Sequence, residues 1–137
     1  MPLNRTPLTG NQIVAMANVS LQQTYTLTGA AIGSTTFQVN FLNVLGLPSL
    51  MYWVRLNSPV GNIAFTPLFS VQNTTTAAVT APNWLPFTNG ALLVPGNIFV
   101  FTIRASVSQA AAQFIIPGAG GGAPSTASLD VVITAGG

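Results

Sequence analysis

The feature that most restricts the fold of this chain is an alternation of apolar and polar residues that recurs along most of the sequence. In residues 97–107, Phe99, Phe101 and Ile103 share one face, and the residues between them share the other. Residues 50–57 alternate in the same way, with Tyr52 and Val54 on one face. A period of two residues is the repeat of a β-strand with one buried face. The chain is therefore expected to fold mainly from half-buried strands.

The same alternation, read between the turn signals given by Gly and Pro, places the expected strands along the chain. They cover residues 13–21, 35–44, 50–57, 63–71, 74–80, 91–94, 97–107, 114–116 and 127–134. The pattern of the first strand continues to Tyr25 and Leu27 after a pair of glutamines.

Three segments carry more specific expectations. Proline has no N–H group to pair with a neighbouring strand, so Pro67 predicts that strand 63–71 is an edge strand or is interrupted there. Residues 108–113 are expected to form a short helical turn. In strand 35–44, Phe37, Val39 and Phe41 are expected to share one face.

Short strands, turn signals about every ten residues and no helical crossovers are typical of an antiparallel all-β sandwich. We expect a jelly roll of about eight strands, with the phenylalanines filling a two-layer core. A chain of 137 residues fits one domain, which we place at residues 11–137, with a Gly-rich loop at 117–124. Residues 1–10 contain two prolines and no long apolar segment, and we expect them to form an N-terminal arm.

Charge is scarce throughout the sequence, which has three Arg, one Asp and no Lys, Glu, His or Cys. Acid–base and covalent catalysis commonly recruit the missing side chains, so the chain is not expected to be an enzyme or to take a small-molecule substrate. No metal or other cofactor is expected either. Three cations are too few for tight binding to phosphates, so no direct nucleic-acid partner is expected. No apolar stretch has the length of a membrane helix, so no membrane partner is expected.

The four charged residues offer one ion pair within the chain at most. Arg104 and Asp130 both fall on polar faces of expected strands, and we predict that they pair across neighbouring strands. Arg5 and Arg55 then have no acidic partner in the same chain. Either they point into water, or they reach carboxylates on another subunit.

Two further groups are candidates for an interface. Trp84 and Phe87 lie in a connection flanked by prolines, and they form either a lid over one end of the sandwich or an interface anchor. Leu3 and Leu8 lie in the N-terminal arm, which is either a free tail or an arm laid on a neighbour.

A surface so poor in charge also bears on function. Soluble proteins usually stay apart through surface charge, and lysines usually protect edge strands from pairing with other chains. This chain has no lysine, while Thr, Asn, Ser and Gln supply 43 neutral polar residues. We therefore expect it to work inside an assembly whose partners cover its edges.

In length, strand pattern and composition, the whole chain resembles the small cement or decoration proteins of tailed-bacteriophage capsids. The resemblance implies a dimer or trimer, made in the host cytoplasm and bound on the outer surface of the capsid. There it would clamp neighbouring copies of the major capsid protein and stabilise the shell. The alternative is a carbohydrate- or receptor-binding β-sandwich of a virion fibre or tail, with Trp84, Trp53 or Tyr52 stacking on sugar rings.

Overall fold

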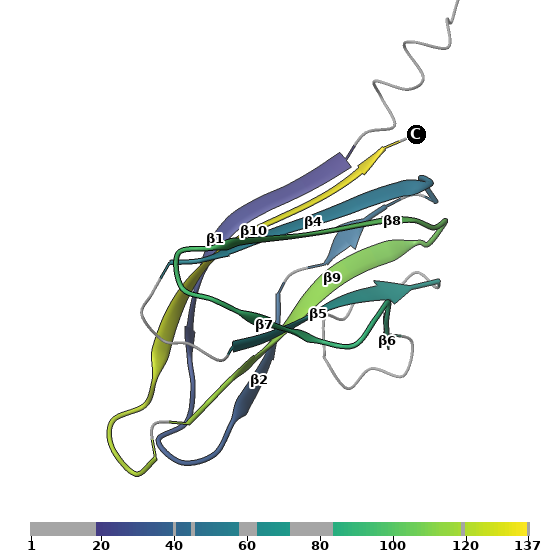
Figure 1. Cartoon of the computed structure of the whole chain (residues 1–137). Coiled ribbons are helices and arrows are strands. Elements are labelled where there is room, and N and C mark those ends of the chain that lie inside the picture. The colour runs from purple at the N-terminus through teal and green to yellow at the C-terminus, as the bar shows by residue number, and fades with distance from the viewer. Residues whose placement is uncertain are drawn as a thin grey trace, which may run out of the picture.

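The computed structural model describes residues 19–39, 41–44, 46–57, 63–71, 84–118 and 120–136. These residues form ten β-strands in two antiparallel sheets that lie face to face (Figure 1). The predicted antiparallel β-sandwich is confirmed. Within the described ranges there is no helix able to cross a membrane.

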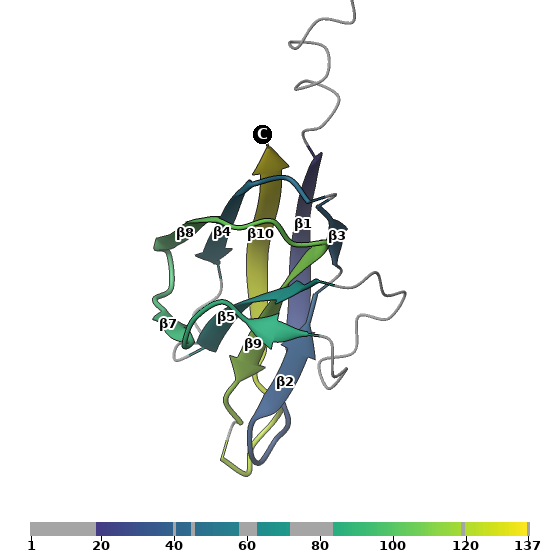
Figure 2. The same ribbon diagram turned by 90° about the vertical axis from the view of Figure 1, so that its right-hand side faces the viewer.

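One sheet has four long strands in the order β1-β10-β4-β8. These strands are β1 (Val19–Thr28), β10 (Thr126–Gly136), β4 (Ser49–Leu56) and β8 (Ile98–Arg104). The pattern that continues to Tyr25 and Leu27 belongs to β1, which pairs with β10 over its whole length. The strand expected at 127–134 is the central strand β10, which runs through the middle of Figure 2.

The other sheet has six strands, of which four follow the order β2-β9-β5-β6, while β3 pairs with β9 and β7 pairs with β5. They are β2 (Thr35–Gln38), β3 (Leu42–Asn43), β5 (Ile63–Ser70), β6 (Leu85–Pro86), β7 (Ala91–Leu93) and β9 (Gln109–Ile116).

The strand order favours the jelly-roll interpretation. When β2 with β3, and β6 with β7, are each counted as one interrupted strand, the ten strands become eight. Renumbered from one to eight along the chain, they have the order 1-8-3-6 in one sheet and 2-7-4-5 in the other. The first strand then lies beside the last, the second beside the seventh, the third beside the sixth and the fourth beside the fifth. This nested pairing is the pattern of a long hairpin folded over into two sheets, as expected for two Greek keys.

The core between the sheets is rich in aromatic rings. Seven of the eight phenylalanines belong to it or pack against it, so the prediction of a Phe-filled core is correct for all but Phe41. Tyr52 on β4 is fully buried, and its hydroxyl donates a hydrogen bond of 2.8 Å to the carbonyl of Leu68 on β5. Burial raises the pKa of the Tyr52 hydroxyl far above its usual value. This bond ties the two sheets together through the core.

The helical turn expected at 108–113 is wrong, because strand β9 begins at Gln109 and includes residues 109–113. Three consecutive alanines, Ala110, Ala111 and Ala112, are fully buried there, and β9 pairs with β5 on one side and with β2 and β3 on the other. Helix propensity is a weak preference that pairing along both edges of a central strand overrides.

The expectation for Pro67 is also wrong, since β5 runs unbroken through it between β9 and the short strands β6 and β7. The carbonyl of its partner Ala112 accepts a bond from the amide of Val39, so the polar groups of Ala112 point away from β5. The backbone nitrogen and carbonyl of Pro67 correspondingly point away from β9, and the carbonyl accepts a hydrogen bond from the amide of Phe87. The missing N–H faces the gap between β7 and β6, where no ladder bond is needed.

The predicted strand 35–44 is split by a slip of one residue against β9. Phe37 pairs with Phe114, whereas Leu42 pairs with Ala110, so one extra residue lies between β2 and β3. Such a bulge reverses the alternation. Phe41 consequently lies on the opposite side of the sheet from Phe37 and does not share its face as expected.

The Gly-rich loop at 117–124 joins β9 in one sheet to β10 in the other and runs beside the connection between β1 and β2. The amide of Gly121 donates to the carbonyl of Ala31 at 2.9 Å, and Gly118 packs so closely on Gly33 that a side chain would not fit. The N-terminal arm at 1–10 and the strand expected at 74–80 lie outside the described residues.

Candidate interaction surface

The outer surface of the four-stranded sheet, called here the open face, is formed by the alternate residues of β1, β10, β4 and β8 that point away from the core. Three of the four charged residues of the sequence lie on it, namely Arg55 on β4, Asp130 on β10 and Arg104 on β8. The fourth, Arg5, lies outside the described residues, as do Leu3 and Leu8. The charge of the described molecule is thus confined to one face.

Arg55 and Asp130 are directly opposite each other on β4 and β10, and a guanidinium nitrogen of Arg55 lies 2.6 Å from a carboxylate oxygen of Asp130. The second carboxylate oxygen accepts a 2.7 Å hydrogen bond from the hydroxyl of Thr24 on β1. Asn57 accepts a 3.0 Å bond from Nε of Arg55 and so orients the guanidinium. The Thr24 bond, followed by the bond from Arg55, lowers the pKa of Asp130 below its ordinary value.

The predicted pair of Arg104 with Asp130 is therefore wrong. Strand β10 neighbours β1 and β4, so Arg104 on β8 is one strand too far away, and its cross-strand neighbour is Ser49. Arg55, expected to have no acidic partner in the chain, is the residue that pairs with Asp130. Arg104 has no acidic partner among the described residues.

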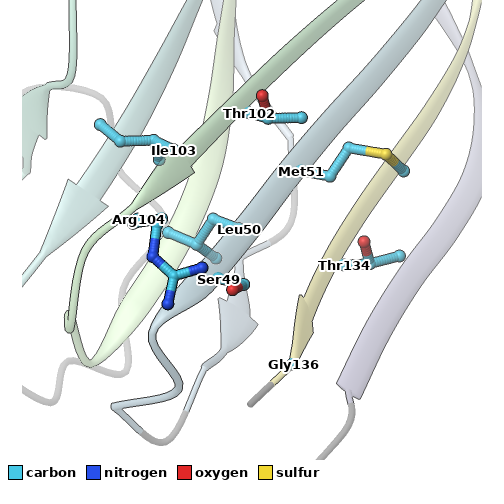
Figure 3. Close-up of a pocket in the computed structure, with 8 residues that line it drawn as sticks. All are labelled: Ser49, Leu50, Met51, Thr102, Ile103, Arg104, Thr134 and Gly136. Carbon is cyan, nitrogen blue, oxygen red and sulfur yellow. The ribbon is translucent and has the colours of Figure 1, made fainter.

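Arg104 lines a shallow hollow of about 430 Å³ at one end of the open face (Figure 3). Its guanidinium lies beside Ser49 at the end of the strands, while Thr102, Met51 and Thr134 form a row across β8, β4 and β10. The hollow offers a cation among hydroxyl groups and methionine, a setting suited to a carboxylate from another molecule.

A second hollow, of about 500 Å³, lies at the other end of the open face, beside Trp53. The guanidinium carbon of Arg55 lies 5.7 Å from the centre of the indole ring, within the range of a cation–π contact. Gln22 and Asp130 also line this hollow. Trp53 is partly exposed, so its ring is accessible to a ligand or partner.

Exposed apolar side chains continue the open face to the edge of the sheet. Ile98 and Val100 on β8 are 53% and 50% exposed, whereas the exposed Leu92 on β7 belongs to the six-stranded sheet. Strand β8 is an edge strand, with β4 as its only partner among the described strands. No lysine, proline or bulge protects this edge, so it is open to pairing with another chain.

The outer surface of the six-stranded sheet, called here the covered face, differs from the open face. Trp84 is 6% exposed and packs there with Leu68, Ala111 and Phe41, with 6.1 Å between the ring centres of Trp84 and Phe41. Phe87 packs against the core, with its ring centre 4.4 Å from that of Phe69.

Trp84 and Phe87 are therefore not exposed anchors, because the pairing of β6 with β5 turns both rings onto the chain itself. Trp84 covers the side of a sheet, where the sequence suggested a lid over one end.

The exposed apolar edge at β8 was not predicted from the sequence. Its signal was present, because Ile98 and Val100 are apolar on the face that the alternation assigns to polar residues. A strand that is apolar on both faces is commonly a central strand that is buried on both sides. Strand β8 instead lies at the edge of the described sheet, where Ile98 and Val100 are exposed.

No protein-family model matches the chain, and no curated protein matches it. A solved structure of the infectious bursal disease virus Gx strain has a TM-score of 0.50 at 9% identity and covers 87% of this chain and 32% of that chain. Bacillus endospore appendages, described as disulfide-linked pili, give a TM-score of 0.44 at 17% identity, covering 87% and 88% of the two chains. A carbohydrate-binding module of the β-sandwich superfamily gives 0.46 at 10% identity, covering 83% and 50%. The similarity concerns the β-sandwich fold alone.

Proposed function

We propose that this chain is a structural subunit of a multi-subunit particle and not an enzyme. In its specific form, the proposal is a cement or decoration protein that binds the outer surface of a viral capsid. There it clamps neighbouring copies of the major capsid protein and stabilises the shell. The proposed partners are the major capsid protein and further copies of this chain.

The observation that carries this proposal is the unprotected edge of the open face. Ile98 and Val100 expose apolar surface along an edge strand whose backbone has a free hydrogen-bonding side among the described strands. A protein with a charge of only +2, built from four charged residues, has little electrostatic protection against association through such an edge. An assembly that covers the edge removes this liability.

The neutral character of the surface also supports a role in a durable particle. Contacts between neutral polar and apolar groups depend little on ionic strength, whereas exposed ion pairs weaken as salt rises. The sequence contains no cysteine, so its contacts would be non-covalent. The β-sandwich fold seen in the structure of infectious bursal disease virus is compatible with such a role.

A second function is favoured by the hollow beside Trp53. A partly exposed indole next to the side chains of Gln22, Arg55 and Asp130 combines a stacking surface with hydrogen-bonding groups, as sugar-binding sites do. The alternative is therefore a carbohydrate- or receptor-binding module of a virion fibre or tail. Binding on a glycan array that disappears with Trp53→Ala would favour this alternative over the cement role.

The test of the cement role is the copy number of the chain in particles purified from its native source. Quantitative mass spectrometry should find the chain at a fixed stoichiometry to the most abundant shell protein. Val100→Lys, which places a charge on the exposed edge, should remove the chain from particles. Thr88→Lys, at an exposed position beside Trp84, should leave the stoichiometry unchanged. Absence of the wild-type chain from particles, or equal incorporation of both variants, would contradict the proposal.

A further inference from the structure

The distribution of charge on the open face points to a specific partner for Arg104. We infer that the open face binds a second copy of the chain, so that Arg104 of each copy pairs with Asp130 of the other. This inference rests on the proposed role in an assembly and names the surface and residues through which the copies meet.

The first argument is the supply of carboxylates. Asp130 is the only acidic side chain in the sequence, so a contact between copies that gives Arg104 a carboxylate side chain must use it. The carboxylate of Asp130 accepts hydrogen bonds from Thr24 and Arg55, and the Asn57 side chain is a third hydrogen-bonding partner, whereas a carboxylate has about four acceptor positions. The Asp130 side chain is 23% exposed and can accept a further donor from outside.

The second argument is the placement of the two residues about the centre of the face. Strands β10 and β8 flank β4 on opposite sides. Asp130 lies opposite Arg55 near one end of β4, and Arg104 lies opposite Ser49 at the other end. The midpoint between them therefore falls on β4 at the level of Tyr52.

This placement suits a two-fold axis. An axis that lies in the plane of the face, passes through that midpoint and runs perpendicular to the line from Asp130 to Arg104 places Asp130 of one copy opposite Arg104 of the other, and the reverse. Two-fold contacts are the commonest between identical chains, and in them residue i meets residue j twice. Both ion pairs thus form together in one dimer.

The third argument is the chemistry of the centre. Tyr52 itself points into the core, so the side chains on the outer face at the midpoint are its neighbours Met51 and Trp53. In the register across the sheet, Trp53 is flanked by Val132 and Val100. A contact centred here buries an apolar row, while the ion pairs lie toward its ends. This is the usual arrangement of an apolar centre with a polar rim.

The first test is sedimentation velocity of the full chain across a range of concentrations. The wild type should form a reversible dimer, and Arg104→Glu, which sets two acidic groups against each other, should raise the dimer Kd at least about tenfold. Arg104→Lys should keep the Kd within about threefold, and Thr88→Glu on the other side of the molecule should leave it unchanged. Unfolding curves of the dilute variants should match the wild type, because Arg104 makes no ion pair within the described chain. A wild-type chain that stays monomeric at high concentration, or Arg104→Glu with an unchanged Kd, would overturn the inference.

A charge reversal then identifies Asp130 as the partner. The combined variant Arg55→Glu, Arg104→Glu and Asp130→Arg exchanges the positive and negative charges of both ion pairs. The pair within the chain and the pair between copies can therefore both still form. It should dimerise with a Kd close to that of the wild type and should not form mixed dimers with it. Loss of dimerisation in a folded triple variant would mean that Arg104 meets a group other than Asp130. A monomeric wild type that still binds particles at fixed stoichiometry would overturn this inference and leave the cement role standing.

Discussion

The two outer faces of the sandwich arise from the same alternating pattern but differ in whether residues of the same chain cover them. On the covered face, Trp84 and Phe41 fold back over Leu68 and Ala111 and close an apolar patch with residues of the same chain. On the open face, no described segment lies over Trp53, and the described charges and the exposed edge of β8 gather there. The alternation alone does not distinguish a face that the chain covers from a face that the described chain leaves exposed.

This difference assigns different physical roles to the two tryptophans. Trp84 is buried within its own chain, so its apolar surface contributes to the stability of the fold. Trp53 is partly exposed and stacks with Arg55, so much of its remaining apolar surface is available to a partner. The substitutions below compare these roles, beginning with the largest expected effect.

The sharpest comparison is between Trp84→Ala and Trp53→Ala. Removal of Trp84 leaves a cavity over the six-stranded sheet and should lower the free energy of unfolding by about 3 kcal/mol. Trp53→Ala should cost the monomer only about 1 kcal/mol, since its ring is not enclosed, but should weaken self-association strongly. Denaturant unfolding at low concentration and sedimentation at high concentration measure the two effects. Equal losses of monomer stability would remove the distinction between the faces.

A second comparison concerns the two sides of β4, where Tyr52 points inward and Trp53 outward. Tyr52→Phe removes the donor to the buried carbonyl of Leu68 and should lower the free energy of unfolding by about 1.5 kcal/mol. Dimerisation should be unaffected, because the hydroxyl lies between the sheets. A change in dimer Kd without a change in monomer stability would contradict the placement of the Tyr52 hydroxyl between the sheets.

The smallest effect is expected from the pH dependence of the open face. The pKa of Asp130 is lower in the folded chain than in the unfolded chain, because Thr24 and Arg55 stabilise its ionised form. The contribution of ionised Asp130 to the free energy of unfolding should be complete above the unfolded pKa of about 4. It should disappear as the pH falls through the lower pKa of the folded chain. For such an exposed pair, we expect a loss of a few tenths of a kcal/mol in monomer unfolding.

Asp130→Asn is the control for this titration. Since Asp130 is the only acidic side chain, the variant should show little change in stability between pH 5 and pH 2, apart from the terminal carboxylate. The same pH dependence in both proteins would show that Asp130 is not responsible.

The sequence predicted well the features that depend on alternation within one uninterrupted strand, whereas the bulge between β2 and β3 reversed the face of Phe41. The fold class and the inward faces of β4 and β8 follow from the period of two, and the turn before β8 follows from Pro95 and Gly96. The structure confirms that turn, because the amide of Asn97 bonds to the carbonyl of Val94.

What depends on the neighbours of a strand was not predictable in this way. Pro67 suggested an edge strand because its missing N–H is a local property, whereas the side to which that group points depends on which strands lie on either side. The sequence predicted that Arg104 pairs with Asp130, whereas the order β10-β4-β8 places Arg55 next to Asp130 instead. The covering of one face by Trp84 likewise depends on how a long connection returns to β5.

The most direct test of the difference between the faces uses the absence of cysteine from the sequence, which makes any introduced thiol unique. Thr102→Cys places a thiol on the open face, and Thr88→Cys places one at an exposed position beside Trp84. The measurement is the rate of thiol alkylation in dilute and in assembled protein. We predict that assembly slows alkylation at position 102 at least about tenfold and leaves position 88 unchanged. Equal rates at position 102 in both states, or protection at position 88 instead, would contradict the assignment of the open face as the assembly surface.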